Sequence, residues 1–208
     1  MKKRKQSFGG QWPIYTGMPN IVPGGFNLDV ESQKFTPGMV IPGGTLAIYN
    51  ESTRLVKVFK TAKVKAIDAT NSKVITLVSN EMIEPIFVVG ESVLKTISGT
   101  FADAPTIAKI EATGNAYKIE LSKAIENLAV GDTIEQVIEV DSNAARIGVP
   151  NCLVLDNRTV GEFETDIDVT NDTMQYAVFE RRILPIPADL KENNLLKANP
   201  NIKLSQSY

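Results

Sequence analysis

Apolar and polar residues alternate along most of the chain, which is the pattern of half-buried β-strands. Residues 45–49 and the alternating run 54–60 lie on either side of a polar turn at 50–53, so the sequence predicts a β-hairpin there. Further strands are predicted at 63–67 and at the β-branched run 73–78. The first part of the regular structure is therefore expected to be a β-sheet.

The middle of the chain continues the same theme. Residues 107–110 and 117–121 flank Thr113-Gly114-Asn115 and predict a second hairpin. Two segments, 88–94 and 129–134, share the order apolar, apolar, Gly, acid, hydroxyl, apolar. A Gly-acid pair suits a tight turn that leads into a strand. We therefore expect strand, turn and strand at close intervals, as in a small β-barrel or sandwich.

Helical patterns are short. Residues 123–128 predict one helical turn before Gly131, and a short helix is expected at 188–196. No long stretch shows an apolar stripe with a period of 3.6 residues. The predicted fold class is therefore all-β.

A late segment, 163–169, also alternates. The alternation places its acids on one strand face and Phe163, Ile167 and Val169 on the other. The densest acidic group of the chain begins here and consists of Glu164, Asp166, Asp168 and Asp172. Alternate carboxylates on one strand lie about 7 Å apart, which is too far for one ion to bind three of them directly. A solvated strand face is the favoured interpretation; a structural cation and a glycosidase carboxylate pair are the alternatives.

The first 45 residues differ from the rest because they are rich in glycine and proline, which interrupt helices and strand ladders. They contain two echoing units, 17–26 and 37–45. They also contain many apolar residues that a solvated linker does not need: Phe8, Trp12, Ile14, Tyr15, Ile21, Val22, Phe26 and Phe35. We expect this segment to bind along another surface, which is the rest of the chain, a sister subunit or a larger assembly.

Composition narrows the chemistry. Among 208 residues with a net charge of −2 there is no histidine and only one cysteine. The usual general base is therefore absent, and so is any cysteine-built zinc site. Cys152 lies in an apolar run and is interpreted as a buried core thiol. We expect no catalytic residues, no metal, no cofactor, and neither a nucleic-acid nor a membrane partner.

Three smaller motifs remain. The pairs Gly9-Gly10, Gly24-Gly25 and Gly43-Gly44 lack the following Lys-Ser/Thr of a phosphate-binding loop, so we interpret them as turn and close-packing residues. The basic run Lys2, Lys3, Arg4 and Lys5 is interpreted as a partner-binding end, with an acidic protein surface favoured over nucleic acid. Arg181-Arg182 is compatible with an interface ion pair or with an exposed sheet edge.

The chain resembles head fiber proteins of tailed phages and prophages of Bacteroides-type bacteria. The similarity covers KQSFGGQWPIYTGMP at 5–19, PGMVIPGGT at 37–45 and KTAKV at 60–64, and it resumes in GVPNCLVL at 148–155 and the acidic strand that follows. A more distant likeness is to phage capsid decoration proteins, which are small trimers on the shell. These proteins have no counterpart of the section 73–140.

The resemblance implies a domain division. It implies an extended attachment arm at 1–45, and a β-domain of decoration-protein type built from 46–72 with 141–187. It further implies an inserted β-domain at 73–140, and a short helix and tail at 188–208.

The resemblance also implies a structural virion protein on the outer capsid surface, made in the host bacterial cytoplasm. Its expected partners are the major capsid protein and further copies of itself, with a homotrimer favoured. The expected capsid-binding residues are those of the arm: Lys2, Lys3, Arg4, Lys5, Phe8, Trp12 and Tyr15.

Two alternatives are kept. The first is a carbohydrate-binding or adhesion module of a bacterial surface, in which Trp12, Tyr15, Tyr49 and Tyr117 stack on sugars. Because no apolar segment follows the basic start as it does in a signal peptide, this alternative is less favoured. The second is a carboxylate-based glycosidase, which the absence of histidine makes the weakest of the three hypotheses.

Overall fold

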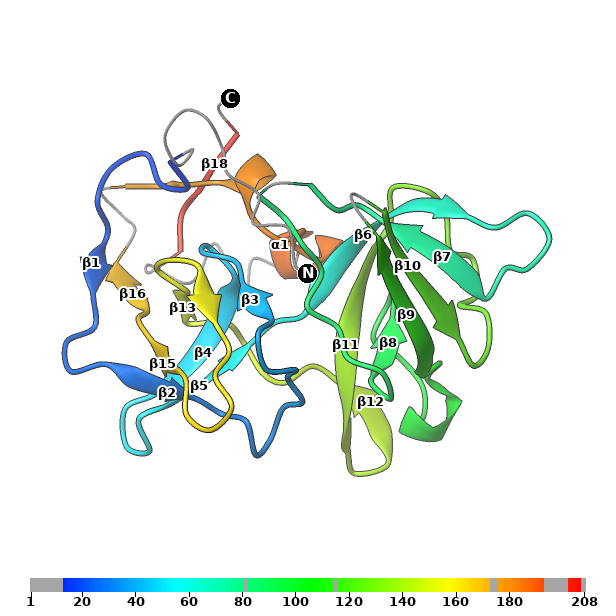
Figure 1. Ribbon diagram of the computed structural model, residues 1–208, viewed down its shortest axis with the longest axis horizontal. Helices are drawn as coiled ribbons and strands as arrows, with labels where there is room; N and C mark the ends of the chain where they lie inside the picture. Colours follow the sequence, from blue (N-terminus) through cyan, green and yellow to red (C-terminus); the bar gives the residue numbers. More distant parts are fainter. Residues whose placement is uncertain (1–12, 81, 114–115, 173–175, 193–201, 207–208) are drawn as a thin grey trace.

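The computed structural model describes residues 13–80, 82–113, 116–172, 176–192 and 202–206. These residues form two β bodies that lie side by side, with the short helix α1 (Ala188–Glu192) between them (Figure 1). The chain begins in the first body, passes into the second and returns to the first. The structure is mostly β, as the alternation predicted.

The first body is built on a five-stranded sheet. Its strand order is β13 (Cys152–Leu153), β4 (Leu46–Asn50), β5 (Leu55–Val58), β2 (Phe26–Leu28) and β15 (Asp166–Ile167). The β4–β5 pair is the predicted hairpin, which is confirmed. Strand β2 runs parallel to β5, and the other neighbours are antiparallel.

Three two-stranded pairs complete the first body. They are β1 (Asn20–Ile21) with β16 (Thr170–Asp172), β3 (Val40–Ile41) with β14 (Arg158–Thr159), and β17 (Val178–Phe179) with β18 (Leu204–Ser205). A 3₁₀ turn, η2 (Glu180–Arg182), follows β17. Each pair joins an early segment to a late one, or two late ones, so both ends of the described chain belong to this body.

The second body is a seven-stranded sheet. In order, its members are β12 (Asn143–Ala145), β11 (Thr133–Val140), β6 (Thr61–Ile67), β7 (Val74–Leu77), β10 (Ala116–Leu121) and β9 (Ile107–Thr113). The seventh strand, β8 (Ser92–Leu94), also pairs with β11. A short 3₁₀ turn, η1 (Phe101–Asp103), precedes β9. Backbone hydrogen bonds between Glu91 and Ile107 and between Val93 and Pro105 join β8 to the start of β9. The strands therefore form a closed ring, which we call the barrel.

Each body has its own apolar core. The core of the first body contains Phe26, Val56 and Cys152, and that of the barrel contains Ile75, Ile119 and Ile134. A third cluster, around Leu46, Phe59, Leu153, Val178, Ile183 and Leu190, packs the C-terminal segment against the first body. Cys152 is fully buried, which confirms the core interpretation.

The predicted second hairpin is β9–β10, and both Gly-acid turns precede strands as expected. Gly90 and Gly131 have φ angles of +85° and +96°, which glycine adopts without a Cβ clash. The helical turn expected at 123–128 is wrong, because these residues form bends and turns that lead to the positive-φ residue Asn127. The helix expected at 188–196 is described as α1 up to residue 192.

The expected extended arm at 1–45 is wrong for the part that the structure describes. Strand β2 lies between β5 and β15, and its Phe26 and Leu28 are 2% and 3% exposed. Ile41 of β3 is fully buried. The glycines and prolines shorten these strands to two or three residues without removing them from the core. Residues 1–12 lie outside the described residues.

Sheet membership also moves the expected domain boundaries. Strand β6 was placed with the section 46–72 of the first body, but it pairs with β11 and β7 in the barrel. Strand β12 was placed with 141–187, but it pairs with β11. The barrel therefore comprises 61–145 rather than 73–140, because β6 and β12 both form hydrogen bonds with strands of the barrel.

The alternating segment 163–169 forms a shorter ladder than expected. Only Asp166 and Ile167 pair with β2. Ile167 and Val169 are buried as predicted, but Phe163 is 85% exposed. The prediction for Phe163 is wrong because residues 161–165 form a loop, in which the period of two does not apply.

Candidate functional site

The most unusual group of side chains lies where the chain crosses from the first body into the barrel. Lys60 stands between β5 and β6, and its Nζ atom lies 2.5 Å from Oε1 of Glu91. The side chains of Lys60 and Glu91 are 0% and 2% exposed. Lysine and glutamate are almost never fully buried unless they are paired, so this pair is a built feature of the junction.

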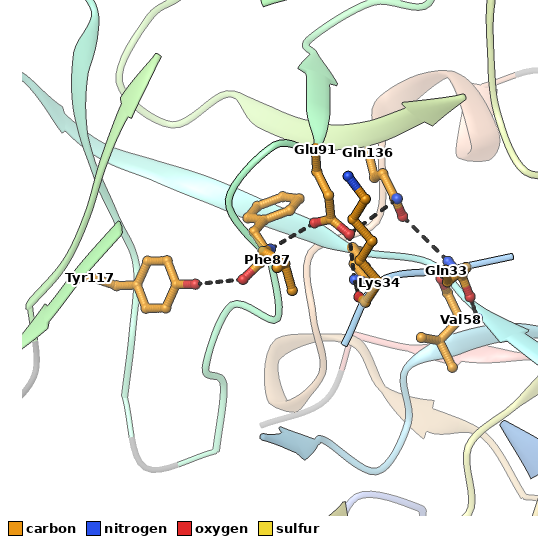
Figure 2. A network of polar contacts seen from close by, with 9 residues as sticks. Gln33, Lys34, Val58, Phe87, Glu91, Tyr117 and Gln136 are labelled. Carbon is orange, nitrogen blue, oxygen red and sulfur yellow. Dashed lines mark hydrogen bonds and ion pairs between the residues drawn. The ribbon is translucent and has the colours of Figure 1, made fainter. Parts of the chain in front are cut away.

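The pair is surrounded by further polar groups from both bodies (Figure 2). Lys60 also donates to the carbonyl oxygen of Lys34, and its Nζ atom lies 4.2 Å from the centre of the Phe35 ring. The second carboxylate oxygen of Glu91 accepts the backbone N–H of Val88 at 2.8 Å. The cation and the carboxylate are therefore both hydrogen-bonded on more than one side.

Two glutamines extend this network. Gln136 of β11 donates its Nε2 to Oε1 of Glu91 at 3.3 Å. Gln33 donates its own Nε2 to Oε1 of Gln136, also at 3.3 Å, and exchanges two hydrogen bonds with the backbone of Val58. Because Gln33 and Val58 belong to the first body and Gln136 to the barrel, the network spans the junction (Figure 2).

Burial works against both charges of the pair. It lowers the pKa of the Lys60 ammonium, and the attraction of Glu91 opposes this shift. It raises the pKa of the Glu91 carboxyl, and Lys60 again opposes the shift. The neutral forms of both groups are therefore more accessible at the junction than they are in water.

A second charged group ties the C-terminal segment to the barrel. Arg146 binds Glu135 of β11 through two hydrogen bonds, Nε to Oε2 at 2.7 Å and Nη2 to Oε1 at 2.5 Å. Its Nη2 atom also lies 2.8 Å from Oδ2 of Asp189 in α1. The two networks hold α1, the barrel and the first body together.

A groove of about 930 Å³ runs between the barrel and the segment 180–191. Its walls carry charges of both signs. Lys95 pairs with Asp132 at 2.8 Å and Lys191 pairs with Glu180, while Asp189 is held by Arg146. Lys63 and Arg181 add two further basic side chains to the lining.

Thiol chemistry and metal binding find little support in the described residues. Burial raises the pKa of the Cys152 thiol, which keeps it protonated and unreactive. Within the described part of the chain, no group of three or more Cys, Asp or Glu side chains is placed to hold a metal ion. The described residues also contain no helix long and apolar enough to cross a membrane.

The arm residues expected to bind a capsid fall into two groups. Lys2, Lys3, Arg4, Lys5, Phe8 and Trp12 lie outside the described residues. Tyr15 is described, and its hydroxyl donates to the carbonyl oxygen of Val154 at 2.8 Å. Its ring packs on the cluster around Leu46 and Val178, and burial raises the pKa of its hydroxyl. Tyr15 therefore anchors the start of the described chain to its own body.

The acidic group is dispersed by the fold. Glu164 and Asp166 are exposed. Asp168 forms an ion pair with Arg158 of β14. The side chain of Asp172 lies outside what the structure describes. The favoured interpretation, a solvated strand face, holds for Asp166 only, because Glu164 is exposed in the loop before β15.

Of the tyrosines considered for sugar stacking, Tyr117 is buried, and Tyr15 and Tyr49 are half-buried. Tyr117 is 5% exposed and donates its hydroxyl to the carbonyl oxygen of Phe87 at 3.3 Å. Tyr49 packs against the Phe26 ring, with ring centres 5.2 Å apart. Tyr15 packs against a different cluster, the one around Leu46 and Val178, so the three rings are dispersed over the fold.

Sequence reasoning missed the buried junction. One signal was present: Val56, Val58 and Lys60 follow one another at a spacing of two, so Lys60 stands on the buried face of its run. Glu91 was noticed only as a turn residue. Its partner Lys60 is 31 residues away, and no local pattern joins the two.

Comparisons with known proteins add no relative. A scan against protein-family models, a search of curated proteins and a search of solved structures each found no match.

Proposed function

We propose that this chain is a structural virion protein, a head fiber or decoration protein bound to the outer surface of a phage capsid. In this proposal it stabilises the shell and presents its barrel outward, where the barrel is free to act in adhesion. Its partners are the major capsid protein and two further copies of itself. The finer architecture, a decoration-type β-domain carrying an inserted barrel, is part of the same proposal.

The observation that carries the proposal is the pairing of the buried charged side chains with one another. Lys60, Glu91, Glu135 and Arg146 are all paired across element boundaries, and together they hold two β bodies in one arrangement. An enzyme places such groups where a substrate reaches them. Here they are buried against one another, away from any external substrate, which supports a structural scaffold.

The start of the described chain supports attachment through the segment before it. Tyr15 is hydrogen-bonded to Val154, and Thr16 exchanges backbone and hydroxyl hydrogen bonds with Ala177. The basic and aromatic residues Lys2 to Trp12 therefore precede a fixed point on the first body. A basic segment with two aromatic side chains suits an acidic protein surface, because aromatic anchors supply much of the energy of an interface.

The test is binding to shells assembled from the major capsid protein, measured by co-sedimentation. Trp12→Ala is expected to weaken binding by about 2 kcal/mol or more, which is roughly 30-fold. Raising the salt concentration is expected to weaken it further, since salt screens the attraction between the basic run Lys2 to Lys5 and an acidic surface.

Tyr15→Phe is the matched control. It removes the hydrogen bond to Val154, so it is expected to lower the free energy of unfolding by about 1 kcal/mol and to leave shell binding unchanged. Wild-type binding by Trp12→Ala contradicts attachment through the arm, and failure of the wild-type chain to bind shells contradicts the proposed function.

A further inference from the structure

The polar network at the junction contains the three functional groups that form an amide bond between side chains. Lys60 offers an amine, Gln136 a carboxamide and Glu91 a carboxyl group that touches both. We propose that Lys60 and Gln136 become joined by an isopeptide bond, with Glu91 as the catalytic acid–base. This inference is independent of the proposed virion function.

The two residues to be joined stand opposite each other: Lys60 directly precedes β6, and Gln136 lies on the neighbouring strand β11. Strands β6 and β11 pair Thr61 with Glu135, and the next backbone hydrogen bond runs from the N–H of Gln136 to the carbonyl oxygen of Lys60 at 2.9 Å. Residues opposite each other in an antiparallel pair have Cβ atoms about 5 Å apart and point to the same face. Both side chains are long enough to meet across that distance.

Glu91 stands where the proton transfers must occur. Its Oε1 atom lies 2.5 Å from Nζ of Lys60 and 3.3 Å from Nε2 of Gln136, so one oxygen contacts both the attacking and the departing nitrogen. The remaining groups hold it there, since its Oε2 accepts the backbone N–H of Val88. Geometry of this kind replaces an encounter in solution by a fixed arrangement of reactants.

The electrophile, the carboxamide of Gln136, is also held in position by a hydrogen bond. Gln33 donates its Nε2 to Oε1 of Gln136 at 3.3 Å, at the oxygen that becomes negative when the carbonyl is attacked. Gln33 is itself 2% exposed and fixed by Val58, so the donor is held in place. The Phe35 ring covers the Lys60 amine and excludes water.

The reaction balances without a further reagent. The Lys60 ammonium transfers a proton to Glu91, and the free amine attacks Cδ of Gln136. Glu91 then moves a proton from the attacking nitrogen to Nε2, the Cδ–Nε2 bond breaks, and ammonia leaves. Burial lowers the pKa of Lys60 and raises that of Glu91, which favours the neutral amine and the protonated acid that the attack requires.

The test is the intact mass of the purified full-length chain after denaturation. The expected mass is that of the sequence less one ammonia molecule. Digestion is expected to yield one branched fragment that joins Lys60 to Gln136, with no tryptic cleavage after Lys60. A folded wild-type chain that keeps its full mass after prolonged incubation overturns the proposal.

Single substitutions test the role proposed for each of the three residues. Lys60→Arg, Gln136→Met and Glu91→Gln are each expected to keep the full mass. Lys65→Arg, which changes an exposed lysine of the following strand β6, is expected to lose ammonia as the wild type does. Loss of ammonia in Lys60→Arg overturns the proposal because the bond then lies elsewhere. Loss of water instead, with Lys60 joined to Glu91, overturns the assignment of Gln136. Because the wild-type mass decides the question alone, a variant that does not fold leaves the test intact.

Discussion

Arg146 links α1 to the barrel through two carboxylates. It neutralises Glu135, whose side chain is 3% exposed, and reaches Asp189 from the same guanidinium. Arg146→Met keeps the length and apolar stem of the side chain but leaves Glu135 buried without a cation. We expect the free energy of unfolding, measured in urea, to fall by about 3–5 kcal/mol.

Lys109→Met is the control for this change. Its ion pair with Glu111 joins side chains that are 61% and 51% exposed. Water solvates both partners when the pair is broken, so no measurable loss of stability is expected. An equal loss in both variants contradicts a special role for burial at Glu135.

The stability of Arg146→Met is also expected to depend on pH. Burial already raises the pKa of Glu135, and Arg146 is the main group opposing that shift, while Asp189 adds to it. Without Arg146 the folded state binds the Glu135 proton more tightly than the unfolded state does. The stability of Arg146→Met should therefore fall as the pH rises above 4.5, the ordinary pKa of the group. Arg146→Met combined with Glu135→Gln should lack this slope in urea titrations at several pH values.

Alanine substitutions at Gly44 and Gly131 distinguish the cost of backbone strain from the cost of overpacking. Both have positive φ angles, +78° and +96°. A Cβ on Gly44 meets Cγ2 of Ile183 at 2.2 Å, whereas one on Gly131 meets nothing within 4 Å. Gly131→Ala should cost about 1–2 kcal/mol from the backbone alone, and Gly44→Ala about 1–3 kcal/mol more from overpacking. Equal melting temperatures for the two variants contradict close packing at Gly44.

Among the strands, β2 shows how far a Gly- and Pro-rich segment is held by its neighbours. It lies between β5 and β15, and the loop that follows is pinned by Gln33 and by the Lys34 carbonyl oxygen, which accepts a hydrogen bond from Lys60. Trypsin needs an extended, free backbone at its cleavage site. We therefore expect native protein to resist cleavage after Lys34, although the Lys34 side chain is exposed.

Limited proteolysis followed by mass spectrometry checks this expectation. Heat-denatured protein should be cleaved after Lys34 at once, which controls for the sequence preference of the enzyme. A native fragment that begins at Phe35 contradicts the described packing and restores the extended arm that the sequence predicts up to residue 45.

Local patterns predicted those elements whose partners are close in sequence. The β4–β5 hairpin and the turns at Gly90 and Gly131 follow from alternation and turn residues alone. Strand β2 was missed because only its pairing with the distant residues of β5 and β15 makes three residues a strand. The junction was missed for the same reason: a buried lysine acquires its meaning from Glu91, which no nearby pattern indicates.

For the molecule as a whole, self-association is the property that separates the proposed trimer from a monomeric module. Large apolar side chains remain exposed on both bodies, among them Phe163 at 85% on the first body and Val130 at 66% on the barrel. In the proposed trimer, the first bodies form the threefold axis and cover Phe163, while Val130 on the barrel stays in solvent. Neither side chain belongs to a core cluster, so neither Phe163→Ser nor Val130→Ser should change the unfolding transition of the monomer.

Analytical ultracentrifugation over a range of concentrations then distinguishes the two variants. The wild type and Val130→Ser are expected to sediment with three times the mass of one chain, and Phe163→Ser is expected to dissociate at concentrations where they do not. The physical reason is that an aromatic side chain buried at an interface is worth about 2 kcal/mol or more, and three copies act together. A single-chain mass for the wild type at every concentration contradicts the trimer. Dissociation of Val130→Ser alone places the contact on the barrel instead.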